Sequence, residues 1–133
     1  RAAQGVEVLF TGADTNGDAA ERHDTALEYA LFMIACEALN NALRHAQPQR
    51  VTVDLDATPD RIRLAVRDDG CGFDSAAPPP PGHLGLVGMH ERARWMGLQL
   101  RIASVRGEGT TVSADANYRH AAARFQDPRL RRR

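Results

Sequence analysis

The stretch that decides the fold of this chain is Glu37-Ala-Leu-Asn-Asn41-Ala-Leu-Arg44-His45-Ala46, which sets four polar groups in an otherwise apolar run. The carboxylate, amide, guanidinium and imidazole stand at i, i+4, i+7 and i+8, which fall on one stripe of an α-helix. A carboxylate and an amide one turn apart can share a hard cation such as Mg²⁺, and the two basic groups beyond them can meet phosphate oxygens. We expect the stripe to lie in a buried helix, where a polar cluster must be satisfied by a partner such as a ligand.

The elements on either side of this helix predict an α/β domain. The helix is expected to begin at an N-cap on Asp24 and to end near Ala46, before Pro48. A second helix is expected over Leu84–Met96, closed by Gly97. Alternating runs predict strands at Gly5–Phe10, Arg50–Asp56, Arg61–Arg67, Leu98–Val105 and Thr110–Asp115. This order favours a two-layer α/β sandwich whose helices cover one face of a mixed, mostly antiparallel sheet.

Apolar residues of both helices are assigned to the core. Leu39, Ala42 and Leu43 are expected to pack inward from the first helix. Trp95 and Met96 are expected to pack the second helix onto the sheet.

The chain is expected to form one domain over residues 1–118, with its core at 24–116. The segment 74–83 contains four consecutive prolines, Pro78–Pro81, and predicts an extended, flexible connection. The basic residues 119–133 are expected to form a flexible, solvated tail. Because the sequence does not begin with Met, we expect it to be a piece of a longer protein.

The charge balance argues against a large electrostatic partner. Basic and acidic side chains number 17 each, so the net charge is zero and no global field favours nucleic acid or an anionic membrane. No stretch approaches the ~18 uninterrupted apolar residues of a membrane span. Cys36 and Cys71 lack metal-ligand spacing and are expected to be free thiols in a reducing cytoplasm.

Three glycine-containing motifs follow the polar helix: Asp68-Asp-Gly-Cys-Gly72, Gly82-His-Leu-Gly85-Leu-Val-Gly88-Met89 and Gly107-Glu-Gly109-Thr110. A carboxylate at a strand end can accept a hydrogen bond from an exocyclic amine such as adenine N6. Backbone N–H groups at the start of a helix form a natural phosphate site. Each motif alone is ambiguous, because Asp-Asp-Gly is a common turn, the glycine-rich helix start is also typical of a linker and the last motif is also a hairpin turn. The glycine-rich helix start matches neither a P-loop nor a Rossmann pattern.

Taken in order, the four motifs resemble those of the ATP-binding catalytic domain of sensor histidine kinases. They are similar to the N box, G1 box, G2 box and terminal Gly-Thr motif of the gyrase, Hsp90, histidine kinase and MutL ATPase superfamily. The phrases Cys36–Ala46 and Gly82–Ala93 look closest to the bacterial subfamily whose partner regulators carry a LuxR/NarL-type DNA-binding domain. The resemblance covers Ala26–Ala116. It departs from the family at Asp69, where many members have Asn, and at the prolines of the segment that would be the ATP lid, 74–83.

The resemblance implies a metal and phosphate end for the site. Asn41 would hold Mg²⁺ between the phosphates, and Glu37 would support the metal or its water. Arg44 and His45 would meet the phosphates or the ribose side.

It also implies a base end and a lid. Asp68 would accept from adenine N6, with Thr110 assisting, while Gly70 and Gly72 would let the backbone close around the base. The residues that would frame the lid and the helix end near the phosphates are Gly82, Gly85, Leu86 and Gly88.

The resemblance therefore predicts a cytoplasmic domain that presents Mg·ATP in two-component signalling, either in a cytoplasmic protein or in the cytoplasmic part of a membrane-anchored sensor. The expected partners are ATP, the histidine-bearing dimerisation hairpin of the same protein and a LuxR/NarL-type response regulator, without direct nucleic-acid or membrane contact. None of the five histidines lies in a helix resembling an acceptor helix, so we expect ATP binding without autophosphorylation by this chain alone. The alternatives are a serine kinase of the anti-sigma-factor type, which shares the fold, and an interaction domain that has lost its nucleotide.

Overall fold

The computed structural model of the chain describes residues 5–13, 25–58, 61–74, 76 and 84–117. Its elements are β1 (Glu7–Ala13), α1 (Thr25–Asn41), the π-helical turn η2 (Ala42–Ala46), β2 (Arg50–Thr58), β3 (Arg61–Asp68), α2 (Leu84–Met96), β4 (Gln99–Val105) and β5 (Gly109–Asn117). The expected N-cap at Asp24, most of the 74–83 segment with Gly82, and the tail 119–133 lie outside the described residues.

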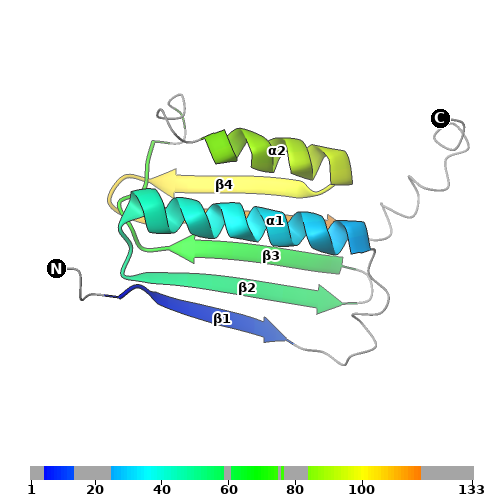
Figure 1. The fold of residues 1–133 in the computed structure, drawn as a ribbon, viewed down its shortest axis with the longest axis horizontal. Helices are drawn as coiled ribbons and strands as arrows, with labels where there is room; N and C mark the ends of the chain where they lie inside the picture. Colours follow the sequence, from blue (N-terminus) through cyan, green and yellow to red (C-terminus); the bar gives the residue numbers. More distant parts are fainter. Residues whose placement is uncertain (1–4, 14–24, 59–60, 75, 77–83, 118–133) are drawn as a thin grey trace, which may run out of the picture.

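A five-stranded sheet with the strand order β1-β2-β3-β5-β4 forms the first layer. The β1–β2 pair is parallel, and the other three pairs are antiparallel. Both helices lie on the same face of the sheet, α1 near β3 and α2 along β4 (Figure 1). The predicted fold class, a two-layer sandwich with a mixed and mostly antiparallel sheet, is confirmed.

Four strands, β1, β2, β3 and β5, extend beyond their predicted ends. The first runs to Ala13, past the Thr11-Gly12 pair that local composition assigns to a loop. Its residues pair in parallel with β2 over their whole length, from Glu7 beside Arg50 to Ala13 beside Asp56. Long-range pairing therefore overrides a weak local preference.

The core lies between the sheet and the two helices. Ile34 of α1, Val51 of β2 and Met89 of α2 are the largest fully buried side chains. Alternate residues of β3 and β5, including Leu64 and Val112, point toward the helices and join the same apolar cluster. Because side chains alternate along a strand, this burial also determines which face of the sheet the side chain at the end of each strand points to.

Two predicted core residues are exposed. The Leu43 side chain is 45% exposed, and Trp95 is 87% exposed. Helix α2 packs through Met89, Ala93 and Met96, so a residue at position 95 points about 100° away from this packed line. The expectations for Leu39, Ala42 and Met96 are confirmed.

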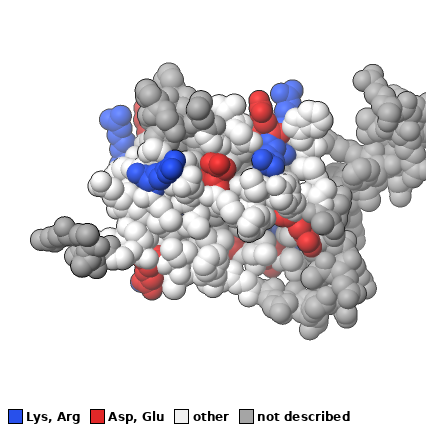
Figure 2. All heavy atoms as spheres, in the orientation of Figure 1, with Lys and Arg blue, Asp and Glu red and all other residues white. Residues whose placement is uncertain are grey.

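The face that carries the helices is mostly uncharged. Figure 2 shows basic and acidic side chains scattered across it, with no block of a single sign. In the described part of the chain, no helix is long and apolar enough to cross a membrane.

Candidate functional site

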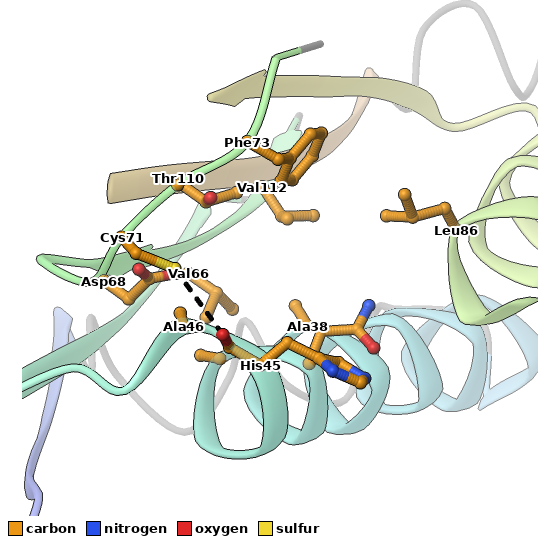
Figure 3. Close-up of a pocket in the computed structure, with 13 residues that line it drawn as sticks. Ala38, His45, Ala46, Val66, Asp68, Cys71, Phe73, Leu86, Thr110 and Val112 are labelled. Carbon is orange, nitrogen blue, oxygen red and sulfur yellow. Dashed lines mark hydrogen bonds between the residues drawn. The ribbon is translucent and has the colours of Figure 1, made fainter. Parts of the chain in front are cut away.

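Two adjoining hollows lie where α1 ends, α2 begins and the central strands terminate. The inner hollow has a volume of about 210 Å³ and the outer about 390 Å³, and both are lined by Asn41 and His45. Together they fall within the range of about 300–1,000 Å³ that is usual for ligand pockets. The inner hollow is lined by Ala38, Asn41, Ala42, His45, Ala46, Val66, Asp68, Cys71, Gly72, Phe73, Leu86, Thr110 and Val112 (Figure 3).

The polar stripe, which runs from α1 into η2, borders the outer hollow. Glu37, Asn41, Arg44 and His45 all line it, together with residues of α2. The stripe is therefore brought together as predicted, but its burial is not: Glu37 and Asn41 are half-buried, whereas Arg44 and His45 are exposed. Asn40, which the sequence argument did not single out, also lines this hollow.

The helix changes from α-helical to π-helical geometry between Asn41 and Ala42, within the polar stripe. After Asn41 it continues as the π-turn η2, whose hydrogen bonds span five residues rather than four. The turn ends at Gln47, which has a left-handed backbone with φ of 49°. The Ala46 carbonyl accepts a hydrogen bond from Cys71 N–H at 2.8 Å, and Cys71 Sγ lies 3.5 Å from the His45 carbonyl oxygen (Figure 3). The end of the helix is thus fastened to the turn after β3.

The Asn41 amide is the strongest sign that this site binds a ligand. Its Nδ2 is buried and has no hydrogen-bond partner. A buried donor without an acceptor is costly, so such groups in native proteins call for a partner. Gly85 of α2 lies against this group, because a Cβ there would overlap Glu37 Oε2 and stand 3.6 Å from Asn41 Nδ2. The first turn of α2 and the polar stripe therefore face each other at close range.

The other end of the site is acidic. Asp68 is half-buried where β3 ends, and its Oδ1 accepts a hydrogen bond from Gly70 N–H at 2.9 Å. Burial raises the pKa of Asp68, while the backbone amides of Gly70 and Thr110 oppose this change. The carboxylate lines the inner hollow beside Thr110, its direct cross-strand neighbour on β5 (Figure 3).

The adjacent carboxylate has a different task. Asp69 Oδ1 accepts hydrogen bonds from the backbone N–H groups of Gln49 and Arg50, both at 2.9 Å. The bond from Arg50 is the largest cause that lowers the pKa of Asp69. Asp69 therefore fastens the turn after β3 to the start of β2, which gives a structural role to the position where the sequence departs from the family pattern.

At two positions of this turn, Gly70 and Gly72, the neighbouring backbone leaves no room for a side chain. A Cβ at Gly70 would overlap the Ala46 carbonyl, and one at Gly72 would overlap the Val105 carbonyl. Gly72 also has a positive φ of 62°, which side chains disfavour. Gly88, in contrast, is exposed on α2 with open space around its Cα.

The sequence argument did not identify Phe73, which lines the inner hollow, or Ser104, which lies behind its wall. Phe73 points across the hollow toward Leu86 (Figure 3). Ser104 of β4 is buried and contacts both Phe73 and Thr110. Side chains alternate along β4, and Leu100 and Ile102 point inward. The same alternation makes Ser104 an inward-facing polar residue, and this signal in the sequence could have identified it.

The inner and outer hollows join at Asn41 and His45 and together form one two-ended hollow. The chain belongs to the histidine kinase-, DNA gyrase B-, and HSP90-like ATPase family, whose model matches residues 26–119. The predicted family is therefore confirmed.

Curated relatives narrow the comparison to kinases. The signal transduction histidine-protein kinase/phosphatase DegS of Brevibacillus brevis is 36% identical over 92 residues, and the oxygen sensor histidine kinase NreB of Staphylococcus carnosus is 36% identical over 96 residues. These alignments cover 69% and 72% of this chain but only 24% and 28% of those proteins. The chain thus spans about a quarter of the length of the curated relatives it matches. Both are histidine kinases, and neither supports the anti-sigma-factor alternative.

Solved structures match the fold. The histidine kinase domain of the Erythrobacter litoralis EL346 blue-light activated histidine kinase has a TM-score of 0.66 at 23% identity, covering 92% of this chain and 56% of that one. Full-length ShkA, crystallised in complex with AMPPNP, has a TM-score of 0.65 at 21% identity, covering 85% of this chain and 26% of that one.

Proposed function

We propose that this chain is the ATP-binding catalytic domain of a cytoplasmic sensor histidine kinase and that it presents Mg·ATP to a histidine on a dimerisation hairpin. The observation that carries the proposal is the two-ended hollow, with a half-buried carboxylate at its inner end and an unpartnered buried amide at its outer end. The exocyclic amine of an adenine base can donate to the carboxylate at the inner end. The oxygens of a polyphosphate chain can accept from the amide at the outer end.

The inner end is proposed to bind the base. Asp68 accepts a hydrogen bond from the exocyclic amine, and Thr110 lies beside it. Phe73, Leu86 and Val112 supply apolar surface for the ring. Gly70 and Gly72 permit the close backbone approach that shapes this end.

The outer end is proposed to bind the phosphates. Asn41 Nδ2 needs an acceptor, which a phosphate oxygen supplies. Arg44 and His45 border the same hollow and add donors, and Gly85 and Gly88 line it from the first turns of α2. Gly82 belongs to the proposed lid, outside the described residues.

The residues present also fit Mg²⁺. Glu37 and Asn41 offer a carboxylate and an amide oxygen, the ligand type that this cation prefers, on adjacent turns of one helix. When bound, Mg²⁺ neutralises charge on the phosphates during transfer. Asn41 would hold the cation through its Oδ1, which would leave its unpartnered Nδ2 to donate to a phosphate oxygen.

The chain contributes positioning rather than covalent chemistry. The hairpin histidine forms a bond from a ring nitrogen to the γ-phosphorus, and the bond from this phosphorus to the β–γ bridging oxygen breaks, releasing ADP. Asp68 and Asn41 hold the two ends of the nucleotide, which keeps the γ-phosphate in line with the attacking nitrogen. A LuxR/NarL-type response regulator is the proposed final acceptor of the phosphoryl group.

Phosphotransfer by the full-length protein tests the proposal. Incubation with ATP labelled at the γ-phosphate should yield protein-bound label that acid removes, as phosphohistidine requires, and Asp68→Ala should abolish it. Acid-stable label would instead identify a serine kinase of the anti-sigma-factor type. Absence of label in the folded wild-type protein would contradict any kinase function.

A further inference from the structure

Ser104 is the buried polar residue of the described core, and it stands directly behind the base end of the hollow. Its side chain is 7% exposed. Asp68 of β3, Thr110 of β5 and Ser104 of β4 are direct neighbours in register, so their side chains form one row across three strands. Cross-strand neighbours of this kind lie about 4.5–5.5 Å apart at Cβ and contact one another.

Three polar atoms surround the Ser104 hydroxyl. Phe73 N–H donates to Ser104 Oγ at 2.8 Å, the Gly109 carbonyl lies at 3.2 Å, and Thr110 Oγ1 lies at 2.7 Å. A serine hydroxyl has one proton and two lone pairs. The amide can only donate and the carbonyl can only accept, which leaves the Thr110 contact to be decided.

Counting protons decides the direction of that contact. If Ser104 donates its proton to the Gly109 carbonyl, its two lone pairs accept from Phe73 N–H and from the Thr110 hydroxyl, and all three contacts are satisfied. If Ser104 instead donates to Thr110, the Gly109 contact is lost. The complete arrangement uses the Thr110 proton, so Thr110 presents only lone pairs toward the hollow.

Two acceptors therefore stand side by side at the base end. The Asp68 carboxylate is one, and the Thr110 hydroxyl oxygen is the other. An exocyclic amine can donate to such a pair directly or through a water. A ring carbonyl at the same position meets two acceptors without a proton between them.

We propose that Ser104 is a positioning residue that orients the Thr110 hydroxyl and makes the hollow select 6-aminopurine nucleotides over 6-oxopurine nucleotides. This inference rests on the proposed nucleotide-binding function. Ser104 acts through Thr110 and has no contact with the nucleotide. Its bond to Phe73 N–H is a separate, base-independent contribution to the wall of the hollow.

The test compares dissociation constants for AMP-PNP and GMP-PNP by calorimetry. Ser104→Ala frees the Thr110 proton, so the ratio of the two constants should shift by about tenfold toward the guanine nucleotide. Thr110→Val removes the hydroxyl and should shift the ratio similarly, whereas Thr110→Ser keeps the hydroxyl and should retain the wild-type ratio.

A double-mutant cycle separates this role from simple destabilisation. Ser104→Ala should not change the ratio further in the Thr110→Val background, because the hydroxyl that it orients is gone. Loss of the Phe73 contact weakens both nucleotides equally and leaves the ratio alone. If Ser104→Ala does not fold, Ser104→Cys keeps the shape with a much weaker hydrogen-bonding group and should show the same shift.

Each outcome is informative. Wild-type protein that binds neither nucleotide would contradict the proposed function itself. Wild-type protein that binds both equally, or a Ser104 variant that weakens both by the same factor, would overturn the selectivity role while leaving nucleotide binding intact.

Discussion

At the scale of single residues, the adjacent carboxylates of Asp68 and Asp69 have different roles. Burial raises the pKa of Asp68, which lines the hollow, whereas backbone donors lower the pKa of Asp69, which holds the start of β2. The sequence shows only two identical neighbours. Their separation into a binding group and a structural group follows from the alternating directions of side chains at the end of a strand.

Asp69→Asn should reduce the loss of thermal stability that the wild-type protein shows as the pH falls. Because its pKa is lowered in the folded state, ionised Asp69 stabilises the fold above the ordinary carboxyl range near pH ~4 and loses this effect as the pH falls through the lowered value. Asn keeps an acceptor for Gln49 and Arg50 but does not titrate. Thermal unfolding midpoints between about pH 3 and 7 measure the difference, and identical acid limbs for both proteins would contradict the role given to Asp69.

Asp68→Asn should separate stability from binding. Because burial raises the pKa of Asp68, its ionisation costs more in the folded state, so its contribution to stability decreases as the pH rises above the ordinary value near ~3.9. The variant should be at least as stable as the wild type at pH ~7, where the buried charge is removed. Nucleotide affinity should nevertheless fall by about 10- to 100-fold, since a hydrogen bond to a charged group is lost. Chemical denaturation and calorimetry measure both, and unchanged affinity would exclude Asp68 from the base end.

At the scale of elements, the connection between η2 and the turn after β3 is the feature that local sequence could not predict. The strands, both helices and the motifs on them follow from alternation, capping and glycine placement. The π-turn depends on Ala46 meeting Cys71, 25 residues away in the chain, and on a left-handed Gln47 before Pro48. The exposure of Arg44 and the extension of β1 to Ala13 likewise depend on tertiary neighbours.

A pair of glycine substitutions tests this connection. Gly70→Ala places a methyl group against the Ala46 carbonyl and should lower the free energy of unfolding by about 1–3 kcal/mol. Gly88→Ala meets open space within α2 and should raise it by about 0.5–1 kcal/mol through helix propensity. Urea unfolding measures both, and equal effects of the two substitutions would contradict the close approach of the helix end and the turn.

At the scale of the whole molecule, one covered face of the sheet creates the site. Both helices lie on the same side of the sheet (Figure 1). The end of β3 and the start of β5 therefore meet the end of η2 and the start of α2 around the inner hollow. The sequence predicted this layer arrangement, and the residues that its four motifs single out include Asn41, Asp68 and Thr110, which line the hollows. Their roles in binding stay predictions. Alternation along β4 could have marked Ser104 as an inward-facing residue, but its contacts with Phe73 and Thr110 depend on which strands are neighbours and could not be predicted.

Calorimetric titration of the chain with Mg·AMP-PNP tests the central claim most directly. The account predicts one site with an affinity in the micromolar range, lost in Asn41→Ala and in Asp68→Ala while both variants remain folded. Glu28→Gln, which removes an exposed carboxylate of α1 that does not line either hollow, is the matched control and should bind as the wild type does. No binding by the folded wild-type chain, or binding that survives in both site variants, would contradict the claim that the two-ended hollow holds ATP.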